Sequence, residues 1–191
     1  MVVGLLVFAI ALVADLAVKN AAWSHFVEGE RWVDQRVVLY PQPMPSVVAI
    51  PNALNLTAVA NQGAAMGLGQ GRRGLFLGVG LVACLAVGAF FAHSLKHGGG
   101  GTRGKLARVT FSLLLAGIVG NLYDRISLGY VRDMFHMVPG LRWSDVLGAL
   151  PAKEVFPWVY NLADVYLCVG VGAVLLLSLL EPKPTKTKSD A

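Results

Sequence analysis

The sequence predicts an α-helical membrane protein with four transmembrane helices, a small extracytoplasmic β-sheet and a short interfacial helix or flap. Apolar residues make up 55% of the 191-residue chain and charged residues only 14%, whereas ordinary soluble domains carry roughly 25% charged residues. The apolar residues gather into long runs, each close to the roughly 20 residues that a bilayer span requires. Longer segments between some of these runs contain strand-like stretches, which predict the sheet.

Four apolar runs are the expected membrane helices, because a lone span in lipid must satisfy its backbone polar groups internally. Asp15 and Lys19 interrupt the first run, so we expect a retained helix rather than a cleaved signal peptide. One membrane-embedded domain is expected over residues 1–181, followed by a disordered tail over residues 182–191 that is rich in Lys, Thr and Pro. The expected spans are residues 2–23, 74–95, 106–126 and 158–180.

The orientation in the membrane follows from the density of lysine and arginine, because cytoplasmic segments carry the excess of these cations. Residues 96–108 and 181–191 together hold seven cations in 24 residues, whereas the segments 24–73 and 127–157 hold seven in 81. Both termini and the loop 96–108 are therefore expected on the cytoplasmic side. This placement assigns the net charge of +5 to membrane topology, and we expect no nucleic-acid partner.

The two outer segments, 24–73 and 127–157, are too long to be simple turns between helices. Residues 134–157 are rich in Trp, Leu and Pro, which predicts a short helix lying on the membrane surface. In the first outer segment, apolar and β-branched residues predict short strands that form a small sheet at the membrane surface. The expected strands are Val37–Tyr40, Ser46–Ile50 and Leu54–Val59.

Polar residues inside or beside the spans carry the functional information, because an ionisable group at membrane depth is costly unless it is paired or hydrated. With the N-terminus inside, every cluster of such residues falls at the same outer level of the bilayer. This convergence of separate segments predicts a site at that level. The residues are Asp15, Lys19, Asn55, Asn61, Asn121, Asp124, Arg125, Asp133, Asn161 and Asp164.

The carboxylates are the candidate reactive groups, since the sequence has no Ser-His-Asp pattern, no HExxH and no GxSxG. We expect no metal and no cofactor. Lys19 lies four residues after Asp15 and shares its helical face, so the two are expected to form an ion pair. Asp124 has Arg125 nearby, and these two residues are expected to pair as well.

Asp133 and Asp164 have no basic partner at helical spacing, although Arg132 adjoins Asp133. Two unpaired carboxylates brought together share one proton, because their like charges raise one of the two pKa values. One can then act as a base on a water molecule while the other donates to a carbonyl oxygen, which is aspartic-protease chemistry. The alternative is that the polar residues only hold the helices together through buried polar bonds.

Four sequence motifs follow one another across the expected helices. They are DLAVK at Asp15–Lys19, NQGAAMG at Asn61–Gly67, GNLYDR followed by GYVRD over Gly120–Asp133, and YNLAD at Tyr160–Asp164. Together they resemble the DxxxK, NxGAAxG, GNxxDR…GxVxD and F/Y-N-x-A-D motifs of the lipoprotein signal peptidases (signal peptidase II), bacterial enzymes that cut signal peptides from lipid-modified prolipoproteins. The chain departs from that pattern in longer outer segments, one around Glu28–Pro45 and one between Asp133 and Asn161, which we expect to alter the flap and the surface sheet.

The resemblance implies a membrane aspartic endopeptidase that removes signal peptides from diacylglyceryl-modified prolipoproteins by cleaving before the lipidated cysteine. It implies a multi-pass protein of the bacterial cytoplasmic (inner) membrane, with its active site at the outer membrane boundary. The expected partners are the prolipoprotein substrates and membrane lipids, and the expected state is a monomer. The implied catalytic dyad is Asp133 and Asp164, and the implied substrate-binding or supporting residues are Asp15, Lys19, Asn61, Gly63, Asn121, Asp124, Arg125 and Asn161.

Two other classes of function would use the same carboxylates. A small transporter or proton relay requires a polar path across the bilayer, whereas the polar residues of this sequence gather at one level. A non-catalytic lipid-binding or assembly factor would keep its function after Asp133 and Asp164 are both neutralised. The two hypotheses are therefore distinguished from the peptidase by a transport assay and by these substitutions.

Overall fold

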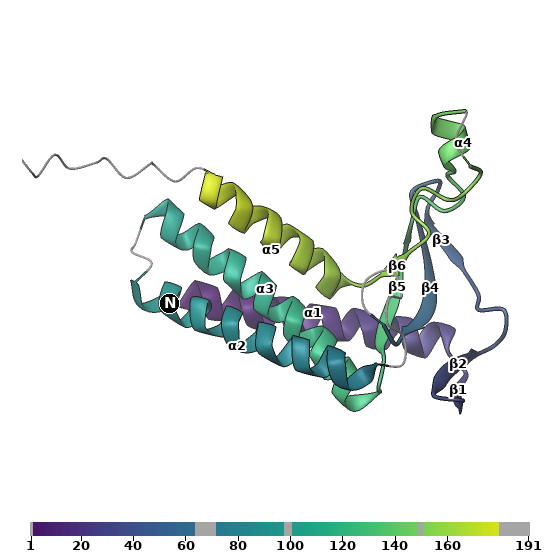
Figure 1. Ribbon diagram of the computed structural model, residues 1–191, viewed down its shortest axis with the longest axis horizontal. Helices are drawn as coiled ribbons and strands as arrows, with labels where there is room; N and C mark the ends of the chain where they lie inside the picture. The colour runs from purple at the N-terminus through teal and green to yellow at the C-terminus, as the bar shows by residue number, and fades with distance from the viewer. Residues whose placement is uncertain (1, 64–71, 98–100, 149–150, 180–191) are drawn as a thin grey trace, which may run out of the picture.

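The computed structural model describes residues 2–63, 72–97, 101–148 and 151–179. Four of its helices are long and apolar enough to cross a membrane, and they form a bundle with small antiparallel sheets at one end (Figure 1). The predicted fold class is thereby confirmed. The tail expected at 182–191, and the NQGAAMG motif from Ala64 onward, lie outside the described residues. The four helices are α1 Val2–Phe26, α2 Arg73–His97, α3 Thr102–Ser127 and α5 Leu162–Leu179.

Helix α3 packs against each of the other three long helices, α1, α2 and α5. Small residues allow this close approach, as is common where helices associate in lipid. A Cβ atom added at Gly117 would lie 2.6 Å from the carbonyl oxygen of Ala163, and one added at Gly120 would collide with the carboxylate of Asp15. Glycine at these two positions therefore lets α1 and α5 approach the C-terminal half of α3.

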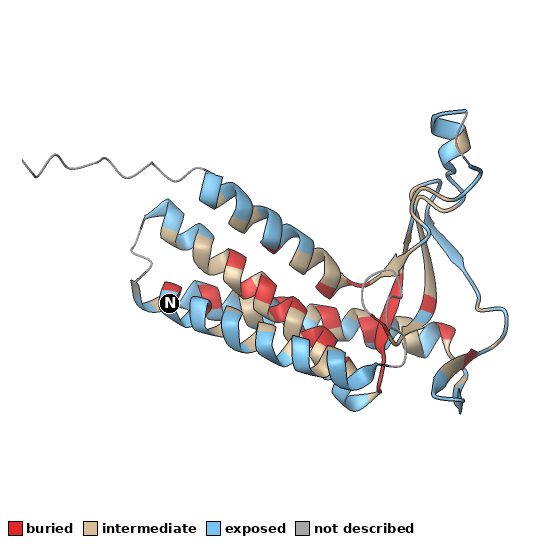
Figure 2. Ribbon diagram, viewed as in Figure 1, coloured by how far each residue is buried: buried red, intermediate tan, exposed pale blue. Residues whose placement is uncertain are grey.

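Much of α1, α2 and α5 is exposed (Figure 2), and many of their exposed residues are large and apolar. Ile10, Val82, Leu85 and Leu175 are examples, and each is at least 60% exposed. Soluble monomers rarely expose apolar surfaces of this extent to water, whereas acyl chains cover such surfaces in a bilayer. The outward faces are therefore those of a membrane-embedded bundle.

A four-stranded antiparallel sheet closes the end of the bundle away from the N-terminus (Figure 1). Its strand order is β3-β4-β5-β6, which places β4 and β5 in the centre. In the register of this central pair, Asn61 lies opposite Val131 and Val59 lies opposite Asp133. The sheet strands are β3 Val47–Ile50, β4 Leu54–Asn61, β5 Val131–Met137 and β6 Val159–Tyr160.

A separate antiparallel hairpin, formed by β1 Gly29–Val33 and β2 Arg36–Tyr40, follows the end of α1. Its buried residue Leu39 joins Phe26 of α1 and Ala58 of β4 in one apolar cluster. This cluster holds the hairpin between the C-terminal end of α1 and the four-stranded sheet.

Strands β2, β3 and β4 were expected from the sequence, whereas β1, β5 and β6 were not. No strand was expected in the outer segment 127–157, where Arg132, Asp133 and His136 interrupt any apolar alternation. The first four residues of β5 are nevertheless all buried, since β5 lies between β4 and β6 and also contacts α1 and α3. Tertiary pairing, which a single sequence does not reveal, overrides local strand propensity here.

The fourth long helix was expected to begin at Trp158, but it begins at Leu162. Asn161 is its N-cap: Oδ1 of Asn161 accepts a hydrogen bond from the backbone N–H of Asp164 at 3.1 Å. In return, Oδ2 of Asp164 accepts a hydrogen bond from the backbone N–H of Asn161 at 3.2 Å. This reciprocal arrangement is a capping box, and it fixes the first turn of α5.

Between β5 and β6 the chain makes an excursion that contains the four-residue helix α4 Trp143–Val146 (Figure 1). A short helix was expected in this segment, and its location on the membrane surface stays a prediction. Glu154 connects the two ends of this segment, because its carboxylate accepts a hydrogen bond from the backbone N–H of Gly140 at 3.0 Å. The same carboxylate lies 3.5 Å from Nε2 of His136.

Candidate active site

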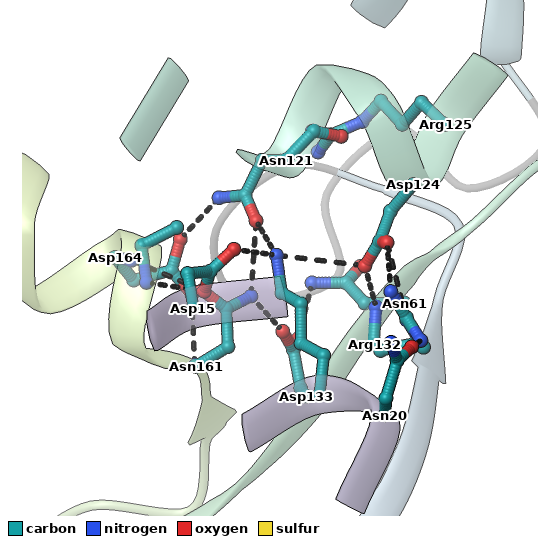
Figure 3. Close-up of polar contacts among 12 residues, drawn as sticks. Asp15, Asn20, Asn61, Asn121, Asp124, Arg125, Arg132, Asp133, Asn161 and Asp164 are labelled. Carbon is teal, nitrogen blue, oxygen red and sulfur yellow. Dashed lines mark hydrogen bonds and ion pairs between the residues drawn. The ribbon is translucent and has the colours of Figure 1, made fainter. Parts of the chain in front are cut away.

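The buried charged and amide side chains of the described residues gather where the helices meet the sheet (Figures 2 and 3). They come from α1, α3, β5 and the start of α5, and Asn61 at the end of β4 joins them. Asn55 lies apart from this group, where its amide donates to the hydroxyl of Ser46. The fully or nearly fully buried members are Asp15, Lys19, Asn121, Asp124, Arg132, Asp133 and Asn161.

Asp133 lies on β5 and is only 2% exposed. Its Oδ1 accepts a hydrogen bond from Nδ2 of Asn161 at 2.6 Å, and its Oδ2 accepts one from Nδ2 of Asn61 at 3.0 Å. Burial, followed by the nearby charge of Asp164, raises the pKa of Asp133 to about 7. Asp133 is therefore a carboxyl group that keeps its proton close to neutral pH.

Asp164 lies in the first turn of α5, where the capping box fixes its side chain. Because Oδ2 is engaged by the backbone of Asn161, Oδ1 is free to face α3. There it accepts a hydrogen bond from Nδ2 of Asn121 at 2.8 Å. Among the described residues, neither Asp133 nor Asp164 forms an ion pair with a lysine or an arginine. Both carboxylates are held by N–H groups of neutral amides.

Two asparagine side chains connect the two carboxylates (Figure 3). Nζ of Lys19 donates to Oδ1 of Asn121 at 2.9 Å. Because an ammonium group can only donate, the amide oxygen of Asn121 must face Lys19 and its NH₂ group must face Asp164. Nδ2 of Asn161 donates both to Oδ1 of Asn121 at 3.1 Å and to Asp133. Lys19 thus fixes the orientation of the amide pair, which in turn fixes both carboxylates.

The expected pair of Asp15 and Lys19 is present, with 2.8 Å between Oδ2 and Nζ and with both side chains fully buried. Nζ of Lys19 also lies 3.5 Å from Oδ2 of Asp124. Oδ1 of Asp15 accepts a hydrogen bond from the backbone N–H of Ala163 at 2.9 Å. A single buried lysine therefore links α1 to α3, and its carboxylate partner links α1 to the start of α5.

The expected pairing of Asp124 with Arg125 is wrong, because Asp124 pairs with Arg132. Nη2 and Nε of Arg132 donate to Oδ1 of Asp124 at 2.8 and 3.1 Å, and the backbone N–H of Arg132 donates to Oδ2 at 3.0 Å. Adjacent residues of a helix point in different directions, whereas β5 returns past the end of α3. Nη1 of Arg132 also donates to Oδ1 of Asn20 at 2.5 Å.

Arg125 instead contacts the end of β4 and the start of α2. Its Nη2 donates to the carbonyl oxygen of Gly63 at 3.1 Å, and its guanidinium lies over the ring of Phe76, 5.7 Å from the centroid. The backbone N–H of Gly63 donates to Oδ1 of Asn61 at 3.0 Å. The NH₂ group of Asn61 is thereby directed towards Asp133.

Two members of this network, Asn20 and Arg132, were not among the predicted site residues. Asn20 has no spacing signal in the sequence beyond its position next to Lys19. Arg132 could have been found if residues 131–137 had been interpreted as a strand, because neighbours in a strand point to opposite faces. Arg132 would then have been unable to pair with Asp133. Among the described residues, no group of three or more His, Cys, Asp or Glu side chains could hold a metal ion.

Comparison with known proteins identifies the family that has this arrangement. A sequence profile described as Signal peptidase (SPase) II matches residues 7–180, which include every residue of the site. The chain belongs to the signal peptidase II family. The prediction of an aspartic endopeptidase of the signal peptidase II type is therefore confirmed, as is the prediction of a multi-pass protein of the bacterial inner membrane.

Individual relatives of the signal peptidase II family agree with this assignment. The chain is 33% identical to a lipoprotein signal peptidase of Desulfitobacterium hafniense (strain DSM 10664 / DCB-2) over 138 residues, which cover 72% of this chain and 77% of that protein. It is 30% identical to the lipoprotein signal peptidase of Geobacter metallireducens over 189 residues, or 97% of this chain and 94% of that protein. A solved bacterial membrane enzyme, 24% identical, shares the fold with a TM-score of 0.68 over 98% of this chain and 93% of the other.

Proposed function

We propose that the chain removes signal peptides from diacylglyceryl-modified prolipoproteins by cleaving before the lipidated cysteine, with Asp133 and Asp164 as the catalytic dyad. One observation carries the proposal. These two carboxylates come from a strand and a helix far apart in the sequence, are joined through the amides of Asn161 and Asn121, and have no cationic partner among the described residues. The other buried carboxylates of the site are bound to lysine or arginine.

The raised pKa of Asp133 supports a division of roles within the dyad. Near neutral pH Asp133 holds the shared proton, and Asp164 is the base that takes a proton from water as the water oxygen attacks the scissile carbonyl carbon. Asp133 then gives its proton to the carbonyl oxygen, and a tetrahedral diol forms. When the C–N bond breaks, Asp164 passes its proton to the leaving nitrogen and a diol hydroxyl returns a proton to Asp133.

The membrane supports this reaction by positioning the substrate. The proposed orientation places both termini in the cytoplasm, because the cation-rich segments 96–108 and 181–191 belong to the helix ends opposite the sheet. The site then lies at the outer boundary of the bilayer. Acyl chains on the substrate cysteine hold the peptide at a defined depth there, so that the scissile bond is presented to the dyad with little loss of freedom in the catalytic step.

The direct test is cleavage of a diacylglyceryl prolipoprotein by the purified protein in detergent. Asp133→Asn and Asp164→Asn are each expected to abolish the appearance of the mature band, because neither variant retains a dyad that shares one proton. Asp34→Asn is the matched control, since Asp34 lies at the exposed tip of hairpin β1–β2. Wild-type turnover in either dyad variant would remove that residue from the mechanism.

A transporter or proton relay is less well supported. The buried charged side chains of the described residues, Asp15, Lys19, Asp124, Arg132 and Asp133, all belong to the network where the helices meet the sheet. A conduction path would require polar groups of this kind through the other half of the bundle as well. Solute- or proton-coupled flux into liposomes would be needed to revive that hypothesis.

A further inference from the structure

Hairpin β1–β2 takes no direct part in the proposed reaction, yet it is hydrogen-bonded to two side chains, those of Gln62 and Tyr130, next to the strands that carry Asn61 and Asp133. Most of its side chains are exposed, and it lies at the outer end of α1 beside the sheet (Figure 1). Its contacts with Gln62 and with Tyr130 are the two that matter for the site, because Gln62 follows strand β4 and Tyr130 precedes strand β5.

Gln62 binds the hairpin through both ends of its amide. Its Oε1 accepts a hydrogen bond from the backbone N–H of Val37 at 3.0 Å, and its Nε2 donates to the carbonyl oxygen of Gln35 at 2.8 Å. The pattern reproduces the way in which one strand pairs with another. It requires one acceptor and one donor on the same side-chain head, which a primary amide provides and a carboxylate does not.

The residues before and after Gln62 are Asn61, whose amide contacts Asp133, and Gly63, whose backbone N–H orients that amide. On one side, Asn61 donates from Nδ2 to Oδ2 of Asp133 at 3.0 Å. On the other side, the backbone N–H of Gly63 donates to Oδ1 of Asn61 at 3.0 Å. Fixing the backbone at Gln62 therefore fixes both the position of the Asn61 amide and the N–H group that directs it towards Asp133.

The hairpin is itself anchored close to the start of β5. The hydroxyl of Tyr130, a residue only 1% exposed, donates to the carboxylate of Glu30 on β1 and accepts a hydrogen bond from Nε1 of Trp23 at 3.2 Å. The ring of Trp32 lies over Gly129, where an added Cβ atom would be 3.1 Å from Cη2. Gly129 has a φ of +88°, a conformation that glycine adopts at little cost.

We propose that Gln62 is a positioning residue for the peptidase reaction, through which hairpin β1–β2 holds the Asn61 amide against the Asp133 carboxyl. The inference rests on the proposed catalytic role of Asp133. A hydrogen bond donated by Asn61 favours the ionised form of Asp133. Loss of that bond makes Asp133 keep its proton to a higher pH, so that the pH at which activity falls in alkali moves upwards.

The test compares kcat and KM for a lipidated precursor peptide across pH 5 to 9. Asn61→Ala removes the contact directly and is expected to move the alkaline limb of the profile to higher pH. Gln62→Met, of similar length but without hydrogen-bonding groups, is expected to move it in the same direction by a smaller amount. It should also lower kcat about tenfold, or about 1.4 kcal/mol, with little change in KM. Arg36→Ala, at an exposed hairpin position between the two bonded backbone groups, is the matched control and should leave both unchanged.

A double variant separates positioning from folding. If Gln62 acts through Asn61, the Gln62→Met and Asn61→Ala shifts do not add, and the double variant shows the Asn61→Ala shift alone. Gln62→Glu, which keeps the bond from Val37, should give a shift between wild type and Gln62→Met. The inference is overturned if Gln62→Met lowers activity or melting temperature while the alkaline limb stays in place, or if the two shifts add. Turnover by Asp133→Asn would instead refute the underlying dyad.

Discussion

The four buried or partly buried carboxylates of the site fall into two groups with opposite surroundings. Asp15 and Asp124 are bound to Lys19 and Arg132, whereas Asp133 and Asp164 are bound only to neutral N–H groups. A cation fixes a carboxylate in its charged form, and the ion-paired group therefore serves the structure. A carboxylate held by amides can gain and lose a proton without leaving a buried cation unpaired. We therefore propose that the partners of an aspartate, and not its depth, determine which chemistry it can perform.

The largest expected effect is on turnover, and it separates the two groups. Asp164→Asn is expected to lower kcat by roughly a thousandfold or more, because general acid–base catalysis is lost together with the activated water. Asp124→Asn should lower the yield of folded protein, while the molecules that do fold keep activity within about tenfold of wild type. Active-site titration combined with cleavage rates measures both quantities. Comparable losses of kcat per folded molecule would contradict the distinction.

The next largest effect is on stability. Lys19→Met leaves Asp15 and Asp124 buried without their shared cation, so the free energy of unfolding should fall by roughly 3–5 kcal/mol. Unfolding in mixed micelles of increasing SDS content measures the change. Lys96→Met, at an exposed position near the other end of the bundle, is the control. Unchanged stability in Lys19→Met would show that the ion-paired group does not brace the helices.

A smaller effect is expected in the pH profile of the wild-type enzyme. The proposed reaction needs one protonated and one ionised carboxyl, so it loses its acid once Asp133 is ionised. Since the pKa of Asp133 is raised to about 7, kcat should decline above that pH and approach a tenfold loss per pH unit. His136 lies on the same strand, three residues after Asp133, so His136→Gln serves as the control and should keep the limb. If the alkaline limb moves in His136→Gln, the raised pKa of Asp133 does not explain it.

The smallest effect is on the pH dependence of melting. The pKa of Asp133 rises from 3.8 to about 7 on folding, so the folded state binds the proton more tightly than the unfolded state. The stability that Asp133 contributes through this proton is complete below pH 3.8 and is lost as pH rises through about 7. Wild-type protein should therefore lose a few degrees of melting temperature, relative to Asp133→Asn, between pH 5 and pH 8. Parallel melting curves for the two proteins would contradict the raised pKa.

Much of the fold could be predicted because lipid imposes strong rules on sequence. Apolar runs of span length gave four helices, and the need to pair or hydrate buried charge drew attention to Asp15, Lys19, Asp133 and Asp164. Strand β5 could not be predicted in the same way. Its residues are buried on both faces by partners from distant parts of the chain, so it carries no periodicity of its own.

The pairing of Asp124 shows the same limit at the level of one side chain. Arg125 is its neighbour in sequence, but the direction of a side chain on a helix depends on a step of 100° per residue, and Arg132 reaches Asp124 only because β5 runs back past α3. The start of α5 was predictable in principle. Asn161 and Asp164 have the spacing of a capping box ahead of an apolar run, and this signal was available in the sequence.

The capping box at the start of α5 means that one carboxylate serves two purposes. Oδ2 of Asp164 satisfies the backbone at the first turn, and Oδ1 faces its proposed catalytic partner. Inserting or deleting a single residue between Asn161 and Asp164 would therefore undo helix initiation and proton transfer together. A change of length after Gly170, the last buried residue of α5, would leave both intact. The length of this helix is therefore tightly constrained at its N-terminal end and less so near its C-terminal end.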